Sequence, residues 1–203
     1  GGQIVGQSPV HAVIFVHAVL EKIGGQQEQK EDYTLVLKGH LALAAQVFPK
    51  GTSGHQLDVL AHQFLWQKGM SYFHGTGHGV GFRLAVHGGP QRVSAAQGTG
   101  APVALQPGMV ISDEPGLYKG GKHGIRIENL VAVTEAMKTE FGQFYTFEVL
   151  TACPYERALI VKDMLTQEEI DMVDDYHRWV REVLIDMVNE DAKQYLIEAT
   201  QPL

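Results

Sequence analysis

His74-Gly-Thr-Gly-His78 begins a group of four short motifs that decides how this chain folds and what it does. The other three are Val86-His87, Asp113-Glu-Pro-Gly116 and Gly124-Ile-Arg-Ile-Glu-Asn129. Each motif places a side chain that can bind a metal or move a proton beside glycine or proline. Together they supply three imidazoles and two carboxylates, a ratio that suits a divalent ion such as Zn²⁺ or Mn²⁺.

The residues before these motifs predict two helices. From Glu31 onward, apolar side chains recur with a helical period as far as Phe48, and Pro49 ends the pattern. Ser53 can cap a second helix, which ends at Gly69. In each helix the apolar side chains gather on one face.

The centre of the chain, residues 70–150, predicts β-structure, because glycine and proline separate short apolar runs. The alternation over residues 125–133 predicts one strand in which Arg126 and Glu128 share a face. A further strand is expected over residues 145–150.

The C-terminal part predicts helix again. Thr166-Gln-Glu-Glu169 is a capping box, and an apolar stripe continues from Ile170 to Met187. Asn189 interrupts the stripe, and a short helix follows as far as Thr200. The fold class indicated is α+β, with two early helices, a β-rich centre and a helical tail.

The composition is that of a globular chain of 203 residues, 44% apolar and 19% charged. With a net charge of −7 and no long Lys/Arg cluster, we expect no nucleic-acid partner. Cys153 is the single cysteine, which excludes an internal disulfide and fits a reducing compartment. No apolar run reaches the ~18 residues of a membrane span, and no signal peptide is visible. We therefore expect a cytoplasmic protein without a membrane partner.

The motifs suggest a hydrolytic metal site. His78, Glu114 and Glu128 can supply ligands on rigid elements, and a hydrolytic site also keeps one coordination position open. His74 and His87 would face the substrate or carry protons. Each motif alone is weak, because a lone histidine is usually structural and Glu-Pro-Gly is common in turns. Their order and their glycines strengthen the interpretation.

As a set, the motifs resemble a known family. Residues 32–151 resemble the catalytic domain of aminopeptidase P, a "pita-bread" metallopeptidase related to prolidase, creatinase and methionine aminopeptidase. The tail is similar to the C-terminal extension of the cytosolic, animal-type branch. The matching segments are Asp32-Tyr-Thr-Leu-Val-Leu-Lys-Gly39, Phe48-Pro-Lys-Gly-Thr52, residues 74–81, Val86-His87, Asp113-Glu-Pro-Gly116, Gly124-Ile-Arg-Ile-Glu-Asn129, Asp175-Tyr-His177 and Glu198-Ala-Thr-Gln-Pro202.

The resemblance implies a curved antiparallel sheet covered by helices over residues 1–150, and a mainly helical extension over residues 151–203. It also implies release of the N-terminal residue from peptides with proline second, by two Mn²⁺ or Zn²⁺ ions, and a homodimer.

The resemblance assigns roles to the motif residues. His78, Glu114 and Glu128 would bind metal, and His74 and His87 would bind substrate and stabilise the tetrahedral intermediate. Glu114 could take a proton from the metal-bound water. Arg126 would orient Glu128 or a neighbouring carboxylate.

The chain departs from the family pattern upstream. The family's two aspartate ligands precede the first helix, but residues 1–20 contain no acidic side chain and residues 1–28 are atypical. His11 or His17 is an alternative ligand. Gly88 stands where the family has glutamate. Because the three remaining ligands carry at most two negative charges, we expect at most one tightly bound ion and impaired catalysis.

Two other interpretations remain open. The chain could be a non-catalytic peptide-binding or dimerisation module of the same fold, which the absent aspartates favour. It could also be another hydrolase of this fold, such as a prolidase or a creatinase-like amidinohydrolase, against which the length and sequence of the tail argue.

Overall fold

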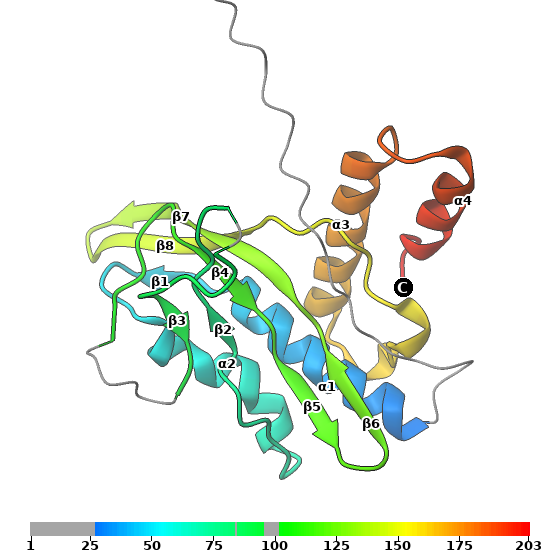
Figure 1. Cartoon of the computed structure of the whole chain (residues 1–203), viewed down its shortest axis with the longest axis horizontal. Helices are drawn as coiled ribbons and strands as arrows, with labels where there is room; N and C mark the ends of the chain where they lie inside the picture. The colour runs from blue at the N-terminus through cyan, green and yellow to red at the C-terminus, as the bar shows by residue number, and fades with distance from the viewer. Residues whose placement is uncertain (1–26, 84, 96–101) are drawn as a thin grey trace, which may run out of the picture.

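The computed structural model describes residues 27–83, 85–95 and 102–203, and Figure 1 shows how its elements are arranged. The α+β class predicted from the sequence is confirmed. The helices are α1 (Gln27–Ala44), α2 (Gly54–Trp66), α3 (Gln167–Leu184) and α4 (Glu190–Ala199), with 3-10 turns at Arg157–Leu159 and Lys162–Met164. The strands are β1 (Phe48–Pro49), β2 (Gly77–His78), β3 (Arg92–Val93), β4 (Val110–Asp113), β5 (Gly116–Lys119), β6 (His123–Arg126), β7 (Asn129–Thr139) and β8 (Gly142–Val149).

The strands form one antiparallel sheet and two smaller ladders. The sheet has four strands in the order β1-β8-β7-β4, while β2 pairs with β3 and β5 pairs with β6. In Figure 1 the sheet curls, α1 and α2 lie along one side of it, and α3 and α4 stand together near the N-terminal half of α1. The expected curved antiparallel sheet with covering helices is therefore present.

The first helix ends earlier than the periodicity indicates. The prediction that it reaches Phe48 is wrong, because α1 ends at Ala44 and Phe48 pairs with Tyr145 of β8. Phe48 precedes Pro49, and a residue before proline is driven towards an extended backbone. The helix is also buried almost all round, so its apolar face is less distinct than the sequence implies.

The second helix follows the prediction closely. Ser53 is its N-cap, and the Ser53 backbone N–H donates to Gln56 Oε1 at 2.8 Å. Gly69 has a φ of +70° where the chain leaves the helix, which glycine adopts without strain. A Cβ on Gly39 would lie 2.2 Å from the carbonyl oxygen of Ala61. Glycine at position 39 therefore allows α1 and α2 to pack closely.

The strand predicted over residues 125–133 is interrupted, so that prediction is wrong in its continuity. β6 ends at Arg126 and pairs with β5, whereas β7 begins at Asn129 and pairs with β4. The chain changes partners across Ile127 and Glu128. The predicted alternation of faces is confirmed, because Ile127 is buried while Arg126 and Glu128 remain partly exposed.

The C-terminal extension forms α3 and α4. The predicted capping box is confirmed, since Thr166 N donates to Glu169 Oε2 and Glu169 N donates to Thr166 Oγ1. The apolar stripe is buried only as far as Val180, because Met187 lies beyond the end of α3 and is exposed. Asn189 caps α4 by accepting from Ala192 N at 2.9 Å.

Two hydrophobic cores result. One lies between α2 and the sheet, around Phe48 and Ile111. The other joins α1 and the β5–β6 hairpin to the C-terminal extension, through Tyr33, Tyr155 and Val173. The second core spans the boundary expected between residues 150 and 151, and the division into two domains stays a prediction. None of the helices in the described segments is long and apolar enough to cross a membrane.

Candidate metal centre

His78 is placed by β2, which lies against β4. A Cβ on Gly77 would lie 1.8 Å from the carbonyl oxygen of Ser112, so only glycine lets the two backbones approach this closely. The backbone N–H of His78 donates to Ser112 Oγ at 3.0 Å, and Gly79 forms a bridge with Ile111. The glycines around His78 therefore fix its distance from the strand that leads to Glu114.

Glu114 follows β4 directly and is almost fully buried. Its backbone N–H donates to the carbonyl of Thr76 at 2.8 Å, which ties it to the His78 motif. Its Oε1 lies 3.0 Å from His78 Nε2, and its Oε2 lies 3.2 Å from Arg126 Nη1. Ser112 Oγ donates to Oε1 at 2.9 Å. The carboxylate is thus held from three sides before any ligand binds.

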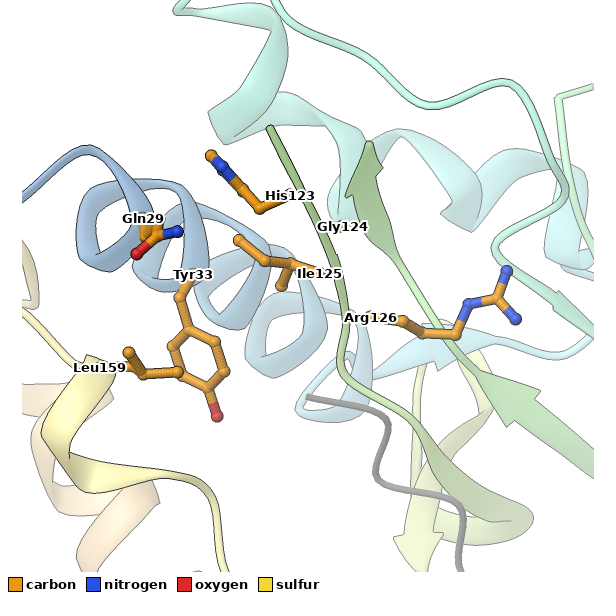
Figure 2. Close-up of a pocket in the computed structure, with 7 residues that line it drawn as sticks. All are labelled: Gln29, Tyr33, His123, Gly124, Ile125, Arg126 and Leu159. Carbon is orange, nitrogen blue, oxygen red and sulfur yellow. The ribbon is translucent and has the colours of Figure 1, made fainter. Parts of the chain in front are cut away.

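Arg126 belongs to β6 and is one of the residues that line the small pocket drawn in Figure 2. That pocket is lined by Tyr33 and Ile125 among others, and Figure 2 shows the guanidinium pointing away from them. Arg126 Nε donates to the Tyr118 hydroxyl at 2.9 Å. Of the two alternatives that the sequence left open for Arg126, the contact found is with Glu114, the carboxylate next to Glu128 in the site.

Glu128 lies at the break between β6 and β7 and is half-buried. Burial raises the pKa of its carboxyl, and the negative charge of Glu114 raises that pKa further. The positive charges of Arg126 and His78 oppose this rise in pKa. Glu128 therefore shares an electrostatic environment with the other three residues, and a bound cation would favour its ionised form.

The two other candidate histidines each lie beside another ring. The ring of His87 is 4.5 Å from the ring of His78. The ring of His74 lies 4.7 Å from that of Tyr72 and 5.5 Å from that of Tyr118. His74 Nδ1 is 2.8 Å from the carbonyl of Gly75, and its Nε2 is buried without a hydrogen-bond partner among the described residues. An unpaired ring nitrogen can serve a bound ligand.

The imidazole and carboxylate side chains of this site are donors that suit a metal ion, but they are not arranged as a complete set of ligands around one point. Within residues 27–83, 85–95 and 102–203, no three His, Cys, Asp or Glu side chains are placed to hold one ion together. The His78–Glu114 pair is the nearest approach, since an imidazole nitrogen and a carboxylate oxygen face each other at 3.0 Å. Imidazole and carboxylate donors suit Zn²⁺ or Mn²⁺. The ligand set His78, Glu114 and Glu128 stays a prediction.

Two residues of the site do not stand out in the sequence. Ser112 bonds to both His78 and Glu114, and Tyr118 joins Arg126 to the ring of His74. The period of a strand places Ser112 on the same face as Glu114, so that contact could have been inferred. The Tyr118 contact depends on the pairing of β5 with β6, which the local sequence does not specify.

Comparison with known proteins shows that the chain is similar in sequence to aminopeptidases. "Aminopeptidase P1" of Arabidopsis thaliana is 45% identical over 179 residues, covering 86% of this chain and 27% of that protein. "Probable Xaa-Pro aminopeptidase P" of Fusarium vanettenii is 52% identical over 158 residues, covering 74% of this chain and 25% of that protein. The chain therefore spans about a quarter of the length of these relatives.

Solved structures share the fold. The X-prolyl aminopeptidase of Caenorhabditis elegans, described as a cytosolic enzyme with a di-nuclear active site, has a TM-score of 0.80 and 38% identity, with 88% of this chain and 29% of that chain covered. The prolidase of Pyrococcus furiosus has a TM-score of 0.52 and 28% identity, with 64% and 34% covered. These neighbours confirm the predicted pita-bread fold.

Family profiles cover most of the chain. The C-terminal region of peptidase M24 matches residues 143–203, and metallopeptidase family M24 matches residues 14–135. The M24 profile match begins at residue 14, upstream of Asp32, the first residue of the motifs that resemble aminopeptidase P. Residues 1–26, with the alternative ligands His11 and His17, lie outside the described part of the structure. The profile match over more than half of the chain and the aminopeptidase P relatives lead to one conclusion: the chain belongs to metallopeptidase family M24.

Proposed function

We propose that this chain is the C-terminal part of the catalytic unit of an Xaa-Pro aminopeptidase. The observation that carries the proposal is the Glu114 carboxylate held between His78 Nε2 at 3.0 Å and Arg126 Nη1 at 3.2 Å. A carboxylate oriented by a cation on one oxygen and facing an imidazole on the other is suited to a metal centre. The aminopeptidase names of the relatives support this class of reaction.

The proposed ligands are His78, Glu114 and Glu128, holding one divalent ion, Mn²⁺ or Zn²⁺. When bound, such an ion polarises the scissile carbonyl and lowers the pKa of a coordinated water. Glu114 would accept the proton of the attacking water, and Arg126, which pairs with Glu114, would keep the carboxylate in position. The substrate class proposed is a peptide with proline second.

His74 and His87 are the proposed substrate contacts. The exposed ring of His87 lies 4.5 Å from that of His78, and His74 offers a buried ring nitrogen without a partner in the described structure. Both imidazoles can donate a hydrogen bond to a developing oxyanion. Tyr118 contacts the ring of His74 and accepts from Arg126 Nε, so it links the proposed substrate side of the site to the proposed metal side.

Catalysis by this chain as given is proposed to be impaired. A pair of divalent ions about 4 Å apart repels strongly unless carboxylates bridge it. Glu114 and Glu128 supply two negative charges, and residues 1–20 contain no acidic side chain to add more. One ion is therefore the expected occupancy, although the nematode neighbour is described as di-nuclear.

The proposal extends to location and assembly. The proposed location is the cytoplasm, which the description of the nematode enzyme as cytosolic supports. The proposed assembly is a homodimer through the C-terminal extension, where Val183, Met187 and Tyr195 are exposed apolar side chains. Light scattering of the purified chain tests this, and only the monomer mass would contradict it.

A second candidate is a non-catalytic peptide-binding module of the same fold. The lack of acidic residues before Glu21, and the incomplete metal shell in the described segments, favour it. The two candidates differ in one respect, since only the enzyme needs Glu114 for turnover.

The test combines metal content with turnover. Elemental analysis for Mn and Zn comes first, followed by incubation of Ala-Pro-Ala with added Mn²⁺, with Ala-Ala-Ala as the matched peptide. We expect up to one ion per chain and slow release of alanine from the proline peptide alone. Both are lost in Glu114→Ala and retained in Glu148→Ala, which changes an exposed glutamate of β8.

The outcomes separate the candidates. Turnover that survives in Glu114→Ala would overturn the assigned role of Glu114. Peptide binding without metal and without turnover would favour the non-catalytic module. Equal release from both peptides would contradict the proposed preference for proline.

A further inference from the structure

The imidazole of His40 lies behind the candidate metal centre and is fully buried. It projects from α1. Its Nδ1 is 3.0 Å from Asp113 Oδ2, while its Nε2 is 3.2 Å from Asn129 Nδ2 and 3.0 Å from the Tyr155 hydroxyl. One side chain therefore contacts two neighbouring strands and the C-terminal extension.

The two strand residues that His40 contacts are the sequence neighbours of the proposed carboxylate ligands. Asp113 precedes Glu114, and Asn129 follows Glu128. Asp113 and Asn129 are also opposite one another in the β4–β7 pairing, where the pairing of the two strands begins. The two ligand-bearing segments leave the sheet at this one point, and a single imidazole spans it.

The hydrogen-bond partners of His40 indicate its tautomer. Asn129 Nδ2 can only donate, so Nε2 of His40 accepts and Nδ1 carries the proton towards Asp113. Both oxygens of Asp113 are buried, and neither forms a hydrogen bond among the described residues, so His40 is the compensating group beside them. His40 Nδ1 itself forms no hydrogen bond among the described residues, so its contact with Asp113 is one of close approach.

The C-terminal extension fixes the other side of this arrangement. Asn129 Nδ2 also donates to the Tyr155 hydroxyl at 3.3 Å, and the Tyr176 hydroxyl donates to Asn129 Oδ1 at 3.3 Å. The rings of Tyr155 and Tyr176 are stacked 4.6 Å apart. The extension thus holds the same asparagine that His40 holds.

We propose that His40 is a positioning residue that sets the distance between Glu114 and Glu128 by clamping Asp113 to Asn129. The proposal rests on the proposed function, because it concerns the metal centre assigned there. Asp113 and Asn129 stay on their strands with their side chains turned inward, so the adjacent glutamates turn outward with a defined spacing. Partners of this outer kind usually change metal affinity by about 10–100-fold.

The experiment measures Mn²⁺ affinity by titration followed by electron paramagnetic resonance, with thermal unfolding recorded for every variant. His40→Asn keeps a donor near the Nδ1 position, His40→Gln keeps a group near the Nε2 position, and His40→Ala keeps neither. The control is Thr34→Val, which changes another fully buried polar residue of α1 that bonds to Val161 N, away from β4.

We expect each of His40→Asn and His40→Gln to weaken Mn²⁺ binding by about 10-fold, and His40→Ala to weaken it more. Thr34→Val is expected to lower the unfolding temperature while its Mn²⁺ affinity stays at the wild-type value. Partial rescue by Asn or Gln relative to Ala shows that the hydrogen-bonding atoms matter, and not the volume of the ring.

Other results overturn the proposal. If folded His40 variants bind Mn²⁺ as tightly as the wild type does, the proposed metal centre is retained but the positioning role of His40 is contradicted. The positioning role is also contradicted if Thr34→Val and a His40 variant lower the unfolding temperature by the same amount and weaken Mn²⁺ binding by the same factor. It is contradicted as well if no His40 variant folds. If the wild type itself binds no Mn²⁺, the proposed function and the role of His40 fall together.

Discussion

The β4–β7 junction has an accessible side and a buried side, and the two sides satisfy their polar groups differently. On the accessible side, the side chains of His78 and Arg126 are 28% and 39% exposed and lie 3.0 Å and 3.2 Å from the carboxylate oxygens of Glu114. On the buried side, His40 and Asp113 are both 0% exposed and belong to a network that reaches Tyr155. The same strands thus present side chains that a ligand from solvent can reach on one side, and side chains closed off from solvent on the other.

This difference in exposure suggests that one side of the junction serves metal binding and the other serves the stability of the fold. The side chains of His78 and Arg126 reach water, so they can give up part of their contact with Glu114 to an ion at small cost. Groups without access to water must keep the partners they have, since an unpaired buried group costs about 1–3 kcal/mol. Substitutions on the buried side are therefore expected to act first on the free energy of unfolding, and those on the accessible side on metal affinity.

The largest effect is expected from Tyr155→Ala on the buried side. The substitution removes a buried ring stacked on Tyr176 and a hydroxyl bonded to Asn129, and loss of a buried aromatic lowers the free energy of unfolding by about 3–5 kcal/mol. Urea denaturation measures this. The matched control is Tyr195→Ala in the same extension, where a 66% exposed ring should change stability by less than about 0.5 kcal/mol. Similar losses in both variants would contradict the contrast.

The next effect concerns the accessible side. Glu114→Gln preserves volume but removes the negative charge, and we expect Mn²⁺ affinity to fall by more than about 100-fold, or about 2.7 kcal/mol. The free energy of unfolding should change by less than about 1 kcal/mol, because the amide can still accept from Ser112. Isothermal titration and urea denaturation measure the two quantities. A large stability loss with unchanged affinity would reverse the assignment of the two sides.

Arg126→Gln should produce a smaller change in the same direction. The guanidinium orients Glu114 without binding metal, so a loss of about 10-fold in Mn²⁺ affinity is expected. Arg178→Gln is the control, since Arg178 pairs with Asp175 on the exposed face of α3. An Arg126 variant that binds Mn²⁺ more tightly would show that the ion pair competes with the metal.

The smallest effect is a pH dependence on the buried side. Burial and the positive charge of Arg157 lower the pKa of His177 to about 4 from 6.5. The unfolded chain therefore binds a proton that the folded chain refuses between about pH 6.5 and about pH 4, so stability falls as the pH drops through this window. Protonation would also end the bond from Tyr155 N to His177 Nε2.

Urea midpoints measured from about pH 7 to about pH 4 test this dependence. His177→Gln should give a flatter profile than the wild type, because the titrating group is removed while a polar side chain remains. Parallel profiles for the two proteins would show that other groups account for the acid sensitivity.

Local signals in the sequence predicted the elements that depend on near neighbours. Ser53 and Thr166 cap helices as expected, because a cap needs only residues three positions away. The same reasoning failed where distant partners decide. Phe48 left the predicted helix for β1, and the predicted strand over residues 125–133 broke at Ile127 when its partner changed from β5 to β4.

The candidate site divides in the same way. The identities of His78, Glu114 and Glu128 can be inferred from residue type and glycine spacing, since both follow from donor chemistry. The partner of Arg126 could not be chosen, because Glu114 and Glu128 are both within reach of a strand residue at that position. The role of His40 left no trace in the motifs, as it depends on a helix more than seventy residues upstream of Asp113.

The sequence by itself determined the family and the caps at Ser53 and Thr166, and it predicted the donor set, because each depends on residue types at short spacing. Only the tertiary structure decided which carboxylate Arg126 contacts and that His40 spans Asp113 and Asn129. The physical reason is that charge pairing and burial act between groups brought together by strand pairing and helix packing, and those contacts depend on the whole chain.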